Sequence, residues 1–217
     1  MAGGLREQKK ARARAAMAAV ASDLFGEHGY DTVSMAQIAR VAAVSEQTLY
    51  NYFPTKESLV FDLADEFEAT LVSAVAGRAP DVDPLDAFGR WLEGFLLGPA
   101  AERATSTPGG MVRQAAASDV VHRALLAGAH RAASHLAAEL TDRSPAEAII
   151  LAHALVGVYV RTVERLGRQP GATGPAAAAS AHAELEALRP LTVRRRRPSR
   201  DRPRADPPVG PEGPADG

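Results

Sequence analysis

Four polar side chains in one short segment could form hydrogen bonds with nucleic acid. They are Glu46, Gln47, Tyr50 and Asn51. Amide groups can pair with adenine edges, a carboxylate can accept from the amino group of cytosine, and tyrosine hydroxyls commonly donate to phosphate. A solvated helix face often carries the same residue types. The segment alone therefore leaves a nucleic-acid interface and an ordinary polar surface both open.

A short helix over residues 46–52 would bring these side chains to one face. Leu49 and Phe53 are four residues apart, so they can share the opposite face and pack into a core. Ser45, immediately before the segment, is a favoured N-cap residue. The spacing therefore predicts a helix with a buried side and a polar, partly aromatic side.

Other helices must position this one. Ser34 precedes residues 35–41, and Gln37 stands three places after it, which is the pattern of a capping box. An amphipathic helix is predicted over 5–27, and a long helix over 56–76. Two short helices joined by three or four residues and packed beside longer ones predict a helix-turn-helix.

The rest of the chain is also predicted to be helical, so the expected fold class is all-α. Further helices are expected at about 84–97, 111–117, 119–140, 145–166 and 176–189. From residue 190 onward there are 7 prolines in 28 residues and almost no apolar side chains, which predicts a disordered tail. Its arginine run, 194–197, could bind DNA non-specifically or could simply be solvated.

Composition excludes several classes of protein. The 217 residues are 46% hydrophobic and 24% charged, enough for a buried core, and they contain no cysteine, which excludes disulfides and thiol chemistry. Neither a nucleophile-elbow nor a phosphate-loop motif is present, and the six histidines form no tight metal-ligand spacing, so we expect no enzyme activity, metal or cofactor. With no long apolar run or signal peptide, a cytoplasmic bacterial protein outside the membrane is expected.

A family resemblance adds to this picture. Residues 24–59 read LFGEHGYDTVSMAQIARVAAVSEQTLYNYFPTKESL, and Gly29-Tyr30, Val44-Ser45 and the run 48–53 carry much of the match. The segment closely resembles the DNA-binding domain of TetR-family transcriptional regulators. The resemblance covers about residues 11–71.

The resemblance implies a domain organisation. Residues 11–71 would form a helix-turn-helix DNA-binding domain, with the motif itself at 34–53. Residues 72–189 would form a C-terminal ligand-binding and dimerisation domain, for about nine helices in all, and residues 190–217 would be the Pro- and Arg-rich tail.

The resemblance also assigns roles at the DNA interface. The helix that ends at Tyr52 would lie in the major groove of a near-palindromic operator. Its residues 46–48 would reach base edges, Tyr50, Tyr52 and Lys56 would hold phosphate, and Asn51 could do either. The full set of expected DNA contacts is Ser34, Gln37, Ser45, Glu46, Gln47, Thr48, Tyr50, Asn51, Tyr52 and Lys56.

One residue departs from the family pattern. Ala43 stands in the turn between the two short helices, where relatives usually carry glycine. If the position needs a positive φ, alanine costs about 1 kcal/mol there. A slightly altered turn is expected, with DNA binding retained.

The C-terminal half is expected to bind an effector. Candidate pocket residues are Phe67, Phe88, Trp91, Phe95, Met111 and His122. These apolar side chains suggest a small hydrophobic or amphipathic ligand of unknown identity. The alternative is that they are simply core residues.

Dimerisation is expected because operators of this class are near-palindromic. In the family the last two long helices form the dimer interface, which here would use Ala152, Leu155, Val156, Tyr159, Val163, Leu185 and Leu188. An intramolecular core stripe is the other interpretation of these residues. The expected function is a dimeric repressor that an apolar ligand releases from DNA; the alternative is a DNA-bound protein that a protein partner switches.

Overall fold

The computed structural model describes residues 2–62, 64–98, 109–169 and 174–192, and within these ranges it contains ten helices and no strand. The helices are α1 (Ala2–His28), α2 (Met35–Val41), α3 (Glu46–Tyr52), α4 (Glu57–Val60), α5 (Ala64–Ala76), α6 (Pro84–Leu97), α8 (Met111–Ala117), α9 (Asp119–Glu139), α10 (Pro145–Arg168) and α11 (Gly174–Thr192). The expected all-α class is confirmed.

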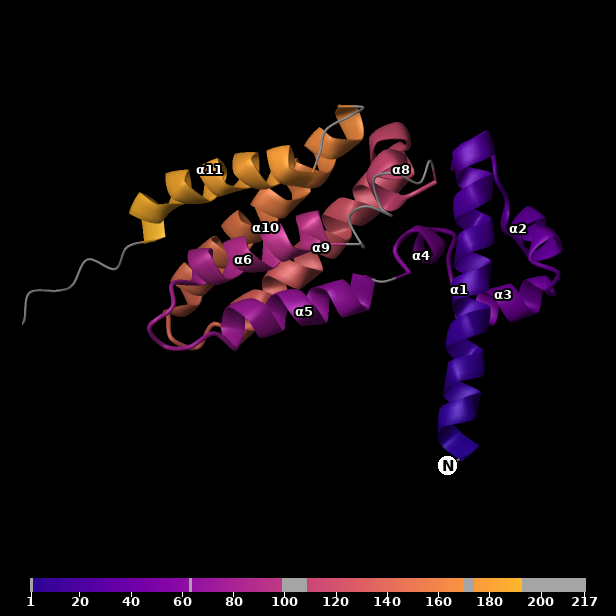
Figure 1. The fold of residues 1–217 in the computed structure, drawn as a ribbon, viewed down its shortest axis with the longest axis horizontal. Coiled ribbons are helices and arrows are strands. Elements are labelled where there is room, and N and C mark those ends of the chain that lie inside the picture. Colours follow the sequence, from indigo (N-terminus) through magenta and orange to yellow (C-terminus); the bar gives the residue numbers. More distant parts are fainter. Residues whose placement is uncertain (1, 63, 99–108, 170–173, 193–217) are drawn as a thin grey trace, which may run out of the picture.

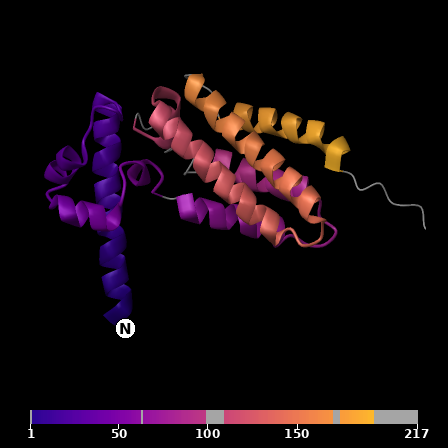
Figure 2. The same ribbon diagram turned by 180° about the vertical axis from the view of Figure 1, so that it is seen from behind.

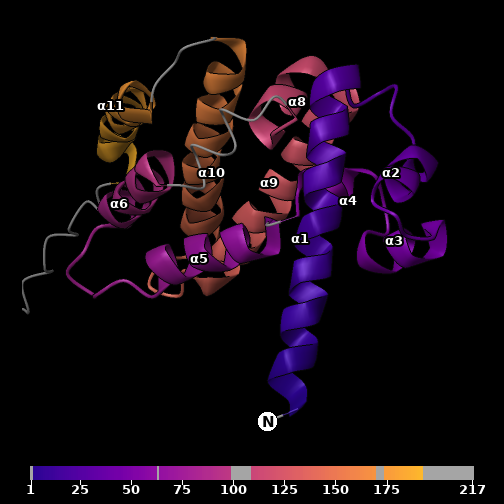
Figure 3. The same cartoon turned by 45° about the vertical axis from the view of Figure 1, so that its right-hand side comes forward.

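The helices form two groups. Helices α1–α4 make an N-terminal bundle, and α5, α6 and α8–α11 make a C-terminal bundle beside it (Figure 1). Seen from behind, the two groups keep the same separation (Figure 2). Helices α2 and α3 lie on the side of α1 that faces away from the C-terminal bundle (Figure 3), so the predicted recognition segment is on the outer side of the molecule.

The N-terminal bundle is built on a few fully buried side chains. Phe25 from α1, Ile38 from α2, and Leu49 and Phe53 from the end of α3 are each no more than 1% exposed. Full burial of such a side chain stabilises a fold by about 1.5–3 kcal/mol relative to exposure. Gly29 ends α1 at φ +80, a conformation that glycine adopts without strain.

The single long helix predicted over residues 56–76 is wrong. The first helix, α4, begins at Glu57, one residue later than predicted, and around its start Ser58 N–H donates to Thr55 Oγ1 at 3.2 Å while Thr55 N–H donates to Ser58 Oγ at 3.3 Å. However, α4 ends at Val60, and Phe61 leaves helical geometry at φ −104 and ψ 35. Asp62 then accepts a hydrogen bond from Arg14 on α1. This tertiary contact, which local sequence cannot reveal, accompanies the break before α5.

Helix α10 is central to the C-terminal bundle, where it packs against α8, α9 and α11. It begins with a capping box, in which Glu147 N–H donates to Ser144 Oγ and Ser144 N–H donates to Glu147. By length and composition α10 could cross a membrane, but half of its most apolar window is buried within the fold, as in the core helix of a globular protein.

The last helix runs further than expected. Helix α11 continues through Pro190 to Thr192, whereas the tail was expected to begin at residue 190. Pro190 has no N–H to donate to the carbonyl four residues earlier, and its ring crowds that carbonyl, so the helix ends two residues later. The expected disordered tail beyond residue 192 lies outside the described residues.

Candidate nucleic-acid interface

Helix α3 has the two faces that its sequence predicts. Leu49 and Phe53 are buried, while Glu46, Gln47 and Asn51 are exposed and Tyr50 is 42% exposed. Gln47 Nε2–H donates to Asn51 Oδ1 at 3.0 Å, one turn along the helix. This bond does not use the Gln47 carbonyl, which can accept, or the Asn51 amide nitrogen, which can donate, and these are the groups through which an amide recognises adenine.

The caps of the two short helices use some of the predicted contact residues. Ser45 Oγ accepts from Thr48 N–H at 3.1 Å, and the two hydroxyls lie 2.8 Å apart. Ser34 and Gln37 form the expected capping box at the start of α2, with Ser34 N–H donating to Gln37 Oε1 at 2.8 Å. These side chains are exposed or half-buried, and their hydrogen bonds orient the helix ends.

The turn between α2 and α3 contains a left-handed residue. Ala43 has φ +55, the only positive φ at a non-glycine position among the residues that the structure describes. Its N–H donates to Arg40 at 3.2 Å, and Val44 N–H donates to Ala39 at 3.0 Å. This pair of bonds is a Schellman motif, which normally has glycine at the Ala43 position. The expected strain at Ala43 is therefore present.

Arg14, on α1, holds the end of the recognition helix. Its Nη1–H donates to the Tyr52 carbonyl at 3.0 Å, its guanidinium lies 4.6 Å from the centroid of the Phe53 ring, and its Nε–H donates to Asp62. This role of Arg14 was not predicted from the sequence. Its place three residues before the buried Met17 was the available signal, because that spacing puts both on one helix face.

Lys56, expected to hold phosphate, also has a structural role. Its Nζ donates to the carbonyls of Tyr30 at 2.8 Å and Val33 at 3.0 Å, and lies 4.1 Å from the centroid of the Tyr30 ring. An ammonium group has three N–H donors, so these two bonds leave one for a phosphate oxygen. The lysine ties the connection between α1 and α2 to the start of α4.

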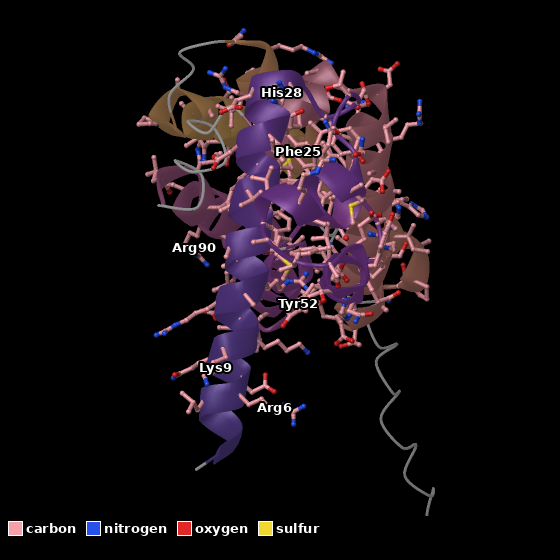
Figure 4. The ribbon with its side chains drawn as sticks, turned by 90° about the vertical axis from the view of Figure 1, so that its right-hand side faces the viewer. Arg6, Lys9, Phe25, His28, Tyr52 and Arg90 are labelled. Atoms are coloured by element: carbon pink, nitrogen blue, oxygen red, sulfur yellow. The ribbon has the colours of Figure 1, made fainter. Side chains whose placement is uncertain are left out.

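The first turns of α1 carry a basic surface beside Tyr52. A shallow hollow is lined by Arg6, Glu7, Lys9, Lys10, Ala13 and Tyr52. Figure 4 shows Arg6 and Lys9 on the part of α1 that extends beyond the rest of the N-terminal bundle, past Tyr52. The fold thus brings a predicted phosphate-contacting phenol next to cations that are more than forty residues away in sequence.

Gln114, on α8, joins the two bundles, a role that the sequence did not suggest. The residue is only 4% exposed. Its Nε2–H donates to the Phe25 carbonyl at 3.3 Å, and its Oε1 accepts from Tyr30 N–H at 3.3 Å. Ser118 Oγ donates to Asp31 at 2.9 Å in the same junction.

The backbone just before α8 lies very close to the backbone of α1 at this junction. A Cβ added to Gly109, just before α8, would lie 1.6 Å from the carbonyl oxygen of Ser22 on α1. Only glycine fits there without displacing a backbone. Helix α8 is therefore held against the end of α1 that leads into the helix-turn-helix.

The aromatic residues predicted to line a pocket come together only in part. Phe67 packs against Trp91 and Phe95 with ring centroids 4.8 and 5.3 Å apart, and against Tyr159 at 4.5 Å. Burial raises the pKa of the Tyr159 phenol, which therefore stays neutral. Phe88 joins the cluster through Trp91 at 5.5 Å.

The other two predicted pocket residues, Met111 and His122, have other contacts than the aromatic cluster. Met111 is half-buried against the core, and His122 Nε2 lies 3.6 Å from a carboxylate oxygen of Glu164 on α10. The neighbouring carboxylate gives His122 a polar partner on the adjacent helix. The histidine is thus placed at an α9–α10 contact.

The residues predicted for a dimer interface pack within one chain. Ala152, Leu155, Val156, Tyr159, Val163 and Leu185 are at most 6% exposed, and Leu188 is half-buried. This matches the interpretation of the stripe as an intramolecular core. The large apolar side chains of α10 that are exposed are Ile149 and Ile150.

Comparison with known proteins agrees with this arrangement. Residues 18–63 match the family described as bacterial regulatory proteins, tetR family. No curated protein sequence matches the chain.

Solved structures share the fold. A transcriptional regulator of the TerR/AcrR family from Aquifex aeolicus has a TM-score of 0.53 at 18% identity, with 81% of this chain and 99% of that chain covered. GusR of Salmonella enterica has a TM-score of 0.53 at 18% identity, covering 83% and 93%. The TetR-family repressor AlkX from Dietzia sp., implicated in biodegradation of n-alkanes, has a TM-score of 0.52 at 17% identity, covering 82% and 96%.

The match over residues 18–63 covers α2, α3, α4 and the second part of α1, and the whole chain has the fold of the solved regulators. Residues 18–63 therefore form a helix-turn-helix domain of the tetR family of bacterial regulatory proteins, within a chain that shares its fold with solved transcriptional regulators.

Proposed function

We propose that this regulator is a homodimeric repressor that places α3 of each subunit in the major groove of a near-palindromic operator. The observation that carries the proposal is the exposed hydrogen-bonding face of α3, with Gln47 and Asn51 held together above the buried Leu49. The protein would act on DNA in the cytoplasm, without enzyme activity of its own.

Phosphate contacts would come from around the recognition helix. The basic hollow at Lys9, Lys10 and Tyr52 lies beside α3, and Tyr50 and the remaining N–H of Lys56 are further donors. Such contacts fix the position of a protein on DNA and make its affinity depend on salt.

The proposed dimer contact uses the outer side of α10. Ile149 and Ile150 are 52% and 71% exposed there, and large apolar side chains that adjoin one another on a surface are typical of an interface. Association through this side would leave the core residues Leu155 and Val156 in place.

Release from DNA would follow binding of a small apolar ligand near the aromatic cluster of Phe67, Trp91, Phe95 and Tyr159. The hydrogen bonds of Gln114 with Phe25 and Tyr30 support this mechanism, because they connect α8 directly to the N-terminal bundle. A ligand that favours a different placement of α8 would change the separation of the two recognition helices.

A protein partner is the second candidate for the switch. The observation that favours it is the packing of the four rings directly against one another, with the Phe67 and Tyr159 centroids only 4.5 Å apart. A ligand would have to displace these rings, whereas a partner could act on the outer surface.

Fluorescence anisotropy with labelled DNA from upstream of the gene, and a scrambled sequence of the same length, tests the proposal. We expect tight binding to the upstream DNA only, and the variant Gln47→Ala should weaken that binding about tenfold or more, since a good bidentate base contact contributes roughly 1–3 kcal/mol of discrimination.

Gln169→Ala is the matched control, because Gln169 is an exposed glutamine at the far end of α10. It should bind like the wild-type protein. Equal affinity for both DNAs would contradict operator recognition by α3, and no binding at low salt would contradict DNA binding altogether.

A further inference from the structure

Two exposed histidines on neighbouring helices of the C-terminal bundle face each other. His130 is on α9 and His153 on α10, and Nδ1 of His130 lies 3.3 Å from Nε2 of His153. The ring centroids are 5.3 Å apart, with the planes at 53°. The pair belongs to the C-terminal bundle, with His153 one turn from Ile149 on α10, and none of the roles proposed above uses either imidazole ring.

The protonation pattern of His153 follows from its other contact. Nδ1 of His153 lies 2.9 Å from the Ile149 carbonyl oxygen, which can only accept. Nδ1 therefore carries the proton, and in the neutral ring Nε2 has a free lone pair directed at His130. A carbonyl that holds the far nitrogen of an imidazole in this way is the usual arrangement around a metal-binding histidine.

The distance between the two facing nitrogens also suits a metal ion. Zinc–nitrogen bonds of about 2.0–2.1 Å at a tetrahedral angle of roughly 109° put two nitrogen ligands about 3.3–3.4 Å apart. We propose that His130 and His153 form a two-histidine chelate for a borderline divalent transition-metal ion, such as Zn²⁺, Ni²⁺ or Cu²⁺, that links α9 to α10.

The metal would replace a proton without changing the net charge of either ring. In the neutral pair His130 Nδ1–H donates to His153; on metal binding the His130 proton would move to Nε2, and Nδ1 would become a ligand. His130 is exposed, so its Nε2–H can donate to water.

Water would complete the coordination. Among the residues that the structure describes, no group of three or more His, Cys, Asp or Glu side chains is placed to hold a metal. A two-ligand site selects for ions that prefer imidazole and excludes Mg²⁺ and Ca²⁺, which prefer oxygen ligands.

Thermal unfolding of the tag-free protein with NiCl₂, ZnCl₂ or MgCl₂ tests the site. Because a metal that binds only the folded state stabilises it, we expect Ni²⁺ and Zn²⁺ to raise the Tm by a few degrees and Mg²⁺ to leave it unchanged. His130→Ala and His153→Ala should each lose this shift. His182→Ala, which removes another exposed histidine on α11, should keep it.

A second measurement does not depend on how the variants fold. Long-range ¹H–¹⁵N spectra of the wild-type histidine rings should show His130 changing from the Nδ1–H to the Nε2–H tautomer when Zn²⁺ is added, while His153 keeps its proton on Nδ1. A Tm shift retained in both alanine variants, or unchanged ring signals at millimolar Zn²⁺, would overturn the proposal. Both measurements are made without DNA, so their result is independent of the proposed repressor function.

Discussion

The side-chain oxygen of Gln114 accepts a hydrogen bond from the backbone N–H of Tyr30, although 84 residues separate the two in sequence. The same amide donates to the carbonyl of Phe25, so one buried side chain satisfies two backbone groups at the end of α1. Neither bundle alone provides these partners. The contact makes the placement of the helix-turn-helix depend on α8.

Replacing Gln114 should weaken both folding and DNA binding. Gln114→Ala leaves the Tyr30 N–H and the Phe25 carbonyl buried without this partner, at a cost of about 1–3 kcal/mol in the free energy of unfolding. Urea unfolding and operator affinity measure the two effects. Gln169→Ala, at an exposed glutamine, is the control and should leave both quantities unchanged. A Gln114→Ala protein with wild-type stability would contradict a structural role for the junction.

Arg14 offers a test of positioning as opposed to direct DNA contact. Arg14→Met keeps the stem against Phe53 but removes the hydrogen bonds to Tyr52 and Asp62, so we expect a loss of about 1–2 kcal/mol in stability together with weaker operator binding. Arg12→Met, at an exposed position two residues earlier, should leave stability unchanged. If the two variants behave alike in urea, Arg14 does not hold α3.

Ala43→Gly should stabilise the protein. Glycine relieves the left-handed strain at φ +55, but it also makes the unfolded chain more flexible, so a net gain of about 0.5–1 kcal/mol is expected. The midpoint of chemical unfolding measures this gain. Ala36→Gly, within α2, is the opposite control and should destabilise by a similar amount because the residue is helical. Destabilisation by both would mean that the turn is not strained.

The basic hollow should set the salt dependence of DNA binding. Replacing Lys9 and Lys10 with Gln removes two cations beside Tyr52 in each subunit, so for the proposed dimer the slope of log K against log salt should become shallower by about 3.6, for both operator and scrambled DNA. Arg90→Gln, on α6, removes an exposed cation from the C-terminal bundle and should leave the slope unchanged. A slope that does not respond to the lysine changes would exclude the α1 arm from the interface.

Acid should loosen the contact between α10 and α11. Partial burial alone would raise the pKa of Glu184, but hydrogen bonds from Arg165 and Arg161 and their charges outweigh it and hold the pKa below the usual value of 4.5. A carboxyl with a lowered pKa in the folded state stabilises the fold above its unfolded pKa, and this contribution is lost as the pH falls through the folded value.

The variant Glu184→Gln should therefore be less stable than wild type at neutral pH and differ less from it below about pH 4. Urea unfolding between pH 3 and pH 7 measures the difference. A constant difference across that range would show that the carboxylate charge is not what joins the two helices.

Local signals in the sequence determined the helices and their outward faces. Ser34 and Ser45 cap the helices that their positions predict, and Leu49 and Phe53 are buried as their four-residue separation predicts. Caps and helical periodicity act within a few residues, so they can be identified without knowledge of the rest of the fold.

Tertiary structure decided what those helices touch. The break after Val60 accompanies an Asp62–Arg14 contact, Lys56 holds the carbonyls of Tyr30 and Val33, and the stripe on α10 lies in the core of its own chain. A periodic apolar stripe has the same pattern whether it packs against its own chain or another. Only the packing of helices distant in sequence distinguishes these cases, because the energy of a buried contact depends on the partner that fills the space opposite.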